Sequence, residues 1–272
     1  ARFLGKRGYQ VTLKEKKGRL GGVLDQVAAS PGKEGFLGIA AALEWDLKAL
    51  GTHIATDAVV TAEGLKAEAD QYSFVVLATG GKPRRMKGGT DAGIYLAQEV
   101  IQGDYRLWNR MNCNQTVIIG GDAAAMETAL FLAGKRWLED GHQGFMERYV
   151  PDEVKQQFLP SGTITLIEKE ERAGRNLGGT RFIIMNELKH IKVMTGARVV
   201  ETGDGYVIVQ KGDSRERLCA DFIIEAMGEE PEQALTSVLG EMQKEFYVVG
   251  DAAVTADIEA AIRGAYELAR SV

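Results

Sequence analysis

The residues best placed to do chemistry lie in residues 116–133, TVIIGGDAAAMETALFLA. The segment begins as a continuous apolar run, typical of a buried strand, and ends as small and apolar residues at helical spacing. Gly120 and Gly121 separate the two parts. A strand, a glycine turn and a helix together point backbone N–H groups at a pyrophosphate. The segment therefore predicts a dinucleotide site, or, in the alternative interpretation, a structural turn alone.

The motif departs from the dinucleotide fingerprint at one position. The fingerprint is G-x-G-x-x-G/A, and this chain has G-x-D-x-x-A. Gly120 supplies the tight turn, and Ala125 is an accepted third residue for contact between helix and strand. Asp122 replaces the glycine that lets a pyrophosphate approach. Because like charges repel, we expect its carboxylate to weaken nucleotide binding at this turn.

Acidic residues end two of the predicted strands. Glu15 ends a strand that begins at Tyr9, and Glu168 follows a strand at 163–167. In a dinucleotide fold, an acid at the end of the second strand binds the ribose hydroxyls. Glu168 comes later after the glycine turn than the usual interval of about 20 residues, because residues 135–161 form an insertion. It favours NAD over NADP, unless it only begins a solvated charged turn.

Two further apolar strands end in the same small-residue turn. Residues 72–81 read YSFVVLATGG, and residues 221–228 read DFIIEAMG. Such a turn either stops a core strand or packs against a bound dinucleotide. The repeat indicates that the chain holds two related halves. The candidate contacts in these turns are Ala78, Thr79, Gly80 and Gly228.

A last buried strand, in the sequence FYVVGDA, ends at Gly250 and Asp251. Asp251 is either a cap for the helix that follows or an acceptor of hydrogen bonds from sugar-alcohol hydroxyls. Because a cap needs no glycine directly before it, we keep Gly250 and Asp251 among the candidate binding residues.

Composition bounds the class of protein. The chain has 272 residues, of which 45% are hydrophobic, which is enough for one large core or two ordinary domains. A formal charge of −5 without a long Lys/Arg block argues against a nucleic-acid surface. No apolar run reaches the roughly 18 residues of a membrane span.

Cysteine and histidine usage bounds the chemistry further. The chain has two cysteines, Cys113 and Cys219, too far apart for a C-x-x-C pair and too few for a four-cysteine cluster. We expect both to be buried structural thiols of a cytosolic protein. The three histidines are scattered, so we expect no metal site.

The start of the chain differs from that of a complete dinucleotide fold. Residues 1–8 read as the end of a helix that closes at Gly8. The first strand and its glycine turn should come before Glu15, and they are not in this sequence. That strand is central in the order 3-2-1-4-5, so its removal would split the sheet. We interpret the sequence as a fragment, a processed chain or a partial record of a longer protein.

These elements predict an α/β fold with two Rossmann-like domains of parallel strands and helices, the second inserted into the first. The first domain takes residues 1–112 and 229–272, and the second takes residues 113–228. Residues 82–114 are interpreted as the crossing between domains. Residues 64–69 are predicted as a strand, and the alternating segments within residues 197–219 as a β-meander.

The order of these motifs resembles that of flavoproteins with two dinucleotide-binding domains. More closely, GYQVTLKEKKGRLGGVLDQVAASPGK is similar to the C-terminal half of the NADH:flavin oxidoreductases. This group includes 2,4-dienoyl-CoA reductase, 2-enoate reductase and trimethylamine dehydrogenase. The resemblance extends along nearly all of the chain. It does not include the N-terminal barrel of that family, which carries FMN and a four-cysteine 4Fe-4S cluster.

The resemblance implies cofactors and roles for the candidate residues. The first domain would hold FAD, with Glu15 on the adenosine ribose, and the second would receive NAD(H). Hydride would pass from the nicotinamide to FAD, and electrons would then pass singly through the cluster to FMN. The residues assigned by the resemblance are Lys16, Arg19 and Gly22 beside Glu15, Gly250 and Asp251 at the flavin ribityl and pyrophosphate, and the turn from Gly120 to Ala125 at NAD(H).

The sequence therefore predicts an electron-entry module that passes reducing equivalents from NAD(P)H to FAD and on to the barrel. It needs no catalytic side chain of its own. The alternative is a non-catalytic domain that binds ADP or another nucleotide in an amine-dehydrogenase-like enzyme. We expect the barrel, small-molecule nucleotides and further copies of the chain as partners, and neither a nucleic acid nor a membrane.

Overall fold

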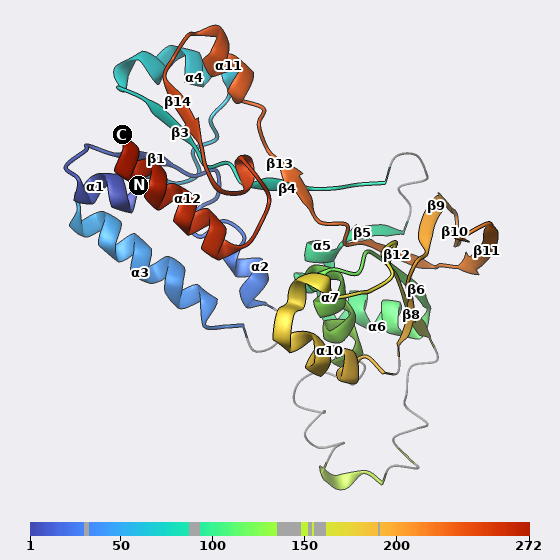
Figure 1. Cartoon of the computed structure of the whole chain (residues 1–272). Helices are drawn as coiled ribbons and strands as arrows, with labels where there is room; N and C mark the ends of the chain where they lie inside the picture. The colour runs from blue at the N-terminus through green and yellow to red at the C-terminus, as the bar shows by residue number, and fades with distance from the viewer. Residues whose placement is uncertain (30–32, 87–92, 135–147, 152–153, 155–161, 190) are drawn as a thin grey trace. The chain divides into compact units, whose positions relative to one another are not determined.

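A computed structural model describes the chain apart from residues 30–32, 87–92, 135–147, 152–153, 155–161 and 190 (Figure 1). Most of the predicted insertion at 135–161 thus lies outside the described residues. The contacts between residues divide the chain into two compact units. Unit 1 is Ala1–Ala28, Gly32–Lys82 and Glu229–Val272, and unit 2 is Ala29–Pro31 and Pro83–Gly228.

Unit 2 is built on a five-stranded parallel sheet with the strand order β5-β12-β6-β7-β8. Figure 1 labels β5, β6, β8 and β12 of this sheet. Its central strands are continuous apolar runs, because helices and further strands cover the two faces of the sheet. This confirms the predicted α/β class. The strands are β5 (Ile94–Leu96), β6 (Gln115–Ile119), β7 (Thr163–Ile167), β8 (Lys192–Met194) and β12 (Phe222–Glu225).

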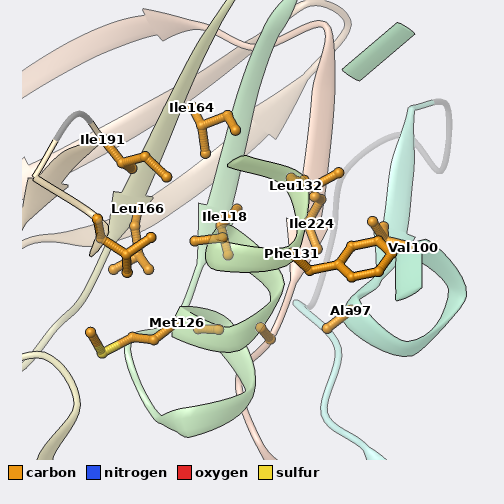
Figure 2. Close-up of a cluster of buried hydrophobic side chains, with 14 of the residues drawn as sticks. Ala97, Val100, Ile118, Met126, Phe131, Leu132, Ile164, Leu166, Ile191 and Ile224 are labelled. Atoms are coloured by element: carbon orange, nitrogen blue, oxygen red, sulfur yellow. The ribbon is translucent and has the colours of Figure 1, made fainter. Parts of the chain in front are cut away.

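Helix α7 (Ala123–Gly134) forms the core of unit 2 with one face of the sheet (Figure 2). Met126 and Leu132 of this helix are fully buried with Ile118 of the sheet. Burying one such side chain stabilises the fold by about 1.5–3 kcal/mol. Further helices of unit 2 include α5 (Ala97–Ile101), α6 (Tyr105–Cys113), η3 (Arg175–Thr180) and α10 (Arg181–Glu187).

The opposite face of the sheet packs against an antiparallel three-stranded meander, β9 (Arg198–Gly203), β10 (Tyr206–Lys211) and β11 (Ser214–Cys219). Val207 and Val209 of β10 are buried with apolar residues of β6 and β12. The predicted β-meander is therefore present.

The boundary between the units differs from the predicted one. The sequence predicts that the second domain starts at residue 113 after a crossing at 82–114, whereas the contacts assign the chain to unit 2 from Pro83. The reason is that β5 pairs with β12, while α5 and α6 pack against α7. The polar composition of this stretch concealed a strand and two helices.

Unit 1 contains two separate parallel strand pairs. β1 (Thr12–Lys14) pairs with β2 (His53–Ala55), and β3 (Val75–Leu77) pairs with β14 (Phe246–Val248). In the part of the chain that the structure describes, no strand joins the two pairs.

The other elements of unit 1 are mostly helices, and one of them corrects a prediction. Residues 64–69, predicted as a strand, lie mainly in α4 (Ala62–Glu68), because the Thr61 hydroxyl accepts the Gly64 N–H at 3.1 Å and caps a helix there. The remaining elements are α1 (Arg2–Lys6), α2 (Leu24–Ala28), α3 (Phe36–Ala49), η1 (Ala69–Gln71), β4 (Gly81–Pro83), β13 (Glu229–Pro231), α11 (Thr236–Glu241), η4 (Gly250–Ala252) and α12 (Ile258–Ser271).

Both cysteines are exposed, so the prediction of buried thiols is wrong. Cys113 is the last residue of α6, and Cys219 ends β11, which lies at the edge of the meander. Neither position turns its side chain into a core. Among the described residues, no helix is both long and apolar enough to cross a membrane.

We predict that Gly120→Ala destabilises unit 2 by roughly 3–5 kcal/mol, because the added methyl group must displace backbone atoms. The matched control is Gly179→Ala in the same unit, where an added Cβ has no heavy atom within 4 Å and should change stability little. Urea unfolding followed by fluorescence measures both. Equal midpoints for Gly120→Ala and the wild type would contradict the prediction.

Candidate functional site

The turn after β6 brings three strands together around one glycine. Gly120 has φ +121°, and a Cβ placed there would lie 2.1 Å from the Ala226 carbonyl oxygen at the end of β12. The Gly120 N–H donates to the Ile167 carbonyl oxygen, at the end of β7, at 2.9 Å. Only glycine satisfies this close approach and this backbone conformation. The start of α7 is thereby fixed at the carboxyl edge of the sheet.

Glu168 lies directly against this turn. A Cβ at Gly121 would lie 2.4 Å from Glu168 Oε2, and Glu168 is only 8% exposed. Its other carboxylate oxygen accepts the Glu170 N–H at 2.7 Å. The alternative of a solvated charged turn therefore does not describe Glu168.

Glu15 has the same local geometry in unit 1. Its Oε1 accepts the Lys17 N–H at 2.9 Å, which again is the amide two residues later. The backbone of Glu15 continues the pairing of β1 with the β2 segment through Ala55 and Ala58. Both units thus end a parallel strand in a glutamate whose carboxylate is oriented by its own chain. A carboxylate so placed can accept hydrogen bonds from ribose hydroxyls.

In the loop after Glu15, predicted binding residues form hydrogen bonds and ion pairs with other residues of the same segment. The Lys17 ammonium donates to the Gly22 carbonyl oxygen at 2.7 Å, and Arg19 forms an ion pair with Asp25 at 2.7 Å. Lys16 is exposed. The loop is therefore closed on itself next to Glu15.

Two of the predicted turns in unit 1 follow β3 and β14. Because these strands are parallel neighbours, the turns lie side by side. Ala78, Thr79 and Gly80 follow β3, and Gly250 and Asp251 follow β14. The Thr79 hydroxyl donates to the Glu232 carbonyl oxygen at 2.6 Å, and the Asp251 carboxylate accepts the Ala256 N–H at 3.0 Å. Asp251 thus organises the chain that leads to α12, and its contact with a sugar stays a prediction.

Two side chains already occupy the N-terminus of α7. Asp122 Oδ1 accepts the Ala125 N–H at 3.2 Å, and Asn176 Oδ1 accepts the Ala123 N–H at 2.8 Å. Burial raises the pKa of the Asp122 carboxyl, although hydrogen bonds from Ala125 and Ala124 oppose the shift. Gly228 lies beside this carboxylate, since its Cβ would be 3.6 Å from Asp122 Oδ2.

Two residues of these sites, Asn176 and Glu229, were not predicted from the sequence. Asn176 belongs to no recognisable motif, so only the folded chain could place it on α7. Glu229 directly follows the turn that ends at Gly228, and this position in the sequence could have identified it as a site residue. Burial, and then the neighbouring Asp251, raise the pKa of the Glu229 carboxyl.

The residues fit the two expected nucleotides unequally. In unit 1, the second oxygen of the Glu15 carboxylate has no hydrogen bond from the described residues and suits a ribose of FAD. In unit 2, Glu168 and the glycine turn suit the ribose of a nicotinamide dinucleotide, and Ala125 is fully buried at the contact of helix and sheet. The pyrophosphate end does not fit as it stands, because Asn176 and Asp122 accept the N–H groups of Ala123 and Ala125 at the start of α7.

Comparisons with known proteins agree with this architecture. Residues 1–260 match the family described as pyridine nucleotide-disulphide oxidoreductase. A metal reductase of Desulforamulus reducens is 30% identical over 98% of this chain and 41% of its own length. An NADH oxidase of Thermoanaerobacter brockii is 36% identical over 48% of this chain and 20% of its own. The chain spans less than half the length of these relatives.

Solved structures show the same fold. Histamine dehydrogenase from Rhizobium sp. 4-9 superposes with a TM-score of 0.78 at 17% identity, over 100% of this chain and 41% of that one. The resemblance to the FAD/NAD(P)-binding region of larger flavin oxidoreductases, predicted from the motifs, is confirmed. The chain belongs to the pyridine nucleotide-disulphide oxidoreductase family.

Proposed function

We propose that this chain is the electron-entry region of a larger flavin oxidoreductase. It would take reducing equivalents from NAD(P)H onto FAD and pass them to an N-terminal barrel that holds FMN and a 4Fe-4S cluster. The observation that carries the proposal is the pair of strand-end glutamates, Glu15 and Glu168, each oriented by the amide two residues later. One ribose-binding carboxylate per unit is what two dinucleotides in one chain require.

The chain's own residues would act by position rather than by covalent chemistry. Glu15 would anchor the adenosine end of FAD, and Asp251 would hold its sugar-alcohol part. Glu168 would accept from the hydroxyls of an unphosphorylated ribose, which favours NADH over NADPH. When bound, FAD supplies the redox chemistry by accepting a hydride from the nicotinamide.

The first test identifies the bound nucleotide and its reactivity. We expect FAD to be released on denaturation of the purified protein and its visible absorbance to be bleached by NADH before denaturation. Chromatography and absorbance spectroscopy measure both. ADP alone, or no nucleotide, would remove the basis of the electron-entry proposal.

A second prediction concerns Glu15. Replacing Glu15 with Ala should weaken FAD binding by about tenfold or more, because a hydrogen-bonded carboxylate is lost from the ribose. Glu63→Ala on the exposed first turn of α4 removes the same charge from unit 1 and should leave FAD binding unchanged. FAD titration of the deflavinated proteins provides the comparison, and equal affinities for both variants would exclude Glu15 from the site.

A second candidate function has its own supporting observation. The hydrogen bonds from α7 to Asp122 and Asn176 leave the pyrophosphate end of unit 2 filled by protein groups. This supports a nucleotide-binding structural domain without catalysis, in an enzyme like the amine dehydrogenase that shares the fold. In that case unit 1 would hold ADP or FAD, and unit 2 would hold nothing.

Asp122→Gly tests the effect that this carboxylate has on nucleotide binding in either candidate. Removing the carboxylate should tighten NADH binding by about fivefold, because a charge repulsion of about 1 kcal/mol is lost. The matched control is Asp104→Gly, which removes the equivalent N-cap from α6, where Asp104 accepts the N–H groups of Arg106 and Leu107. Isothermal titration measures the affinities. If Asp122→Gly binds NADH no better than the wild type, our account of this turn is wrong.

A further inference from the structure

The segment between β7 and α10 is attached to the glycine turn at two points. The Gly174 N–H donates to the Gly121 carbonyl oxygen at 2.5 Å, and Asn176 Oδ1 accepts the Ala123 N–H at 2.8 Å. The first contact holds the last residue before Asp122, and the second holds the first residue of α7. The segment therefore lies across the start of the helix.

Further contacts with the core of unit 2 hold the segment in place. Ala173 is 1% exposed and packs in the core of unit 2. The Arg181 guanidinium of α10 donates to the Ala173 carbonyl oxygen at 2.7 Å. Gly174 lies against α7, because a Cβ at this position would be 2.6 Å from Met126 Sδ. These contacts position the segment so that Asn176, although exposed, accepts the Ala123 N–H.

The occupied N–H groups are those that an anion at this helix would use. The first N–H groups of an α-helix have no partner within the helix, and phosphates bind them with the aid of the helix dipole. Here an amide oxygen takes the Ala123 N–H, and a carboxylate oxygen takes the Ala125 N–H. Each protein oxygen stands where a pyrophosphate oxygen would accept.

We propose that Asn176 closes the pyrophosphate end of the second nucleotide site. A dinucleotide binds the first N–H groups of α7 only when the exposed side chain of Asn176 gives up the Ala123 N–H. This inference rests on the proposed function, because it takes unit 2 to be the nicotinamide-dinucleotide site. The effect of Asn176 differs from the charge repulsion by Asp122, because Asn176 is neutral and belongs to a different element.

The test begins without nucleotide, so that the contact is measured independently of the proposed function. Hydrogen exchange of the full chain, followed by NMR, should show that the Ala123 amide exchanges faster in Asn176→Ala than in the wild type. Asn186→Ala on the exposed side of α10 is the control and should leave the Ala123 amide unchanged. Equal exchange rates in Asn176→Ala and the wild type would overturn the assignment of the contact.

NADH titration of the same proteins then tests the closing of the site. Asn176→Ala should bind NADH about fivefold more tightly than the wild type, because the wild type must first break one neutral hydrogen bond of about 1 kcal/mol. Asn176→Asp should bind it more weakly, because a carboxylate keeps the cap and adds repulsion. Asn186→Ala should match the wild type.

The outcomes separate the two proposals. Tight NADH binding that is equal in the wild type, Asn176→Ala and Asn176→Asp overturns this inference and leaves the electron-entry proposal intact. Binding by Asn176→Ala together with none by the wild type supports this inference and contradicts electron entry from NADH in the natural chain. No binding by any variant overturns both, even when thermal melting shows that all of them are folded.

Discussion

The contact between Gly120 and the Ala226 carbonyl oxygen sets the geometry of unit 2. It brings the end of β6 against the end of β12, and the Gly120 N–H ties the same turn to β7. Three neighbouring strands therefore end around one residue without a side chain. Because α7 begins immediately afterwards, the direction of its first N–H groups and their position relative to Glu168 follow from this contact.

The two units share one structural feature, a glutamate at the end of a parallel strand, in different surroundings. Each ends a parallel strand in a glutamate whose carboxylate accepts the N–H two residues later. Around Glu15 the neighbouring loop is closed on itself through Lys17 and Gly22, and the carboxylate is half-buried. Around Glu168 the carboxylate is buried under the glycine turn, and α7 is capped by side chains. The units are thus similar in backbone and unequal in the anion-binding groups that they offer.

Sequence periodicity predicted the strands correctly where the pattern of buried residues repeats regularly along the chain. The apolar runs of β6, β7 and β12 and the meander alternation around β10 were predictable, because each pattern follows from which faces are covered. Periodicity failed where a single side chain determines which secondary structure forms. Thr61 caps a helix in a stretch predicted as a strand, and the polar residues after Pro83 form elements that only their packing on α7 reveals. The exposure of Cys113 and Cys219 likewise depends on where an element ends, which composition does not specify.

By itself, the sequence determined the α/β class, the glycine turn at Gly120, the acids at strand ends and the departure at Asp122, because each depends on residue type and local spacing. The tertiary structure alone decided what surrounds them. Asn176 is distant from Ala123 along the chain, and it meets the helix only because the β7–α10 segment packs on α7. Likewise, Glu229 acquires its raised pKa from burial and from Asp251, a residue contributed by a different strand end. Contacts between residues remote in sequence carry no local pattern, so they arise only when the chain has folded.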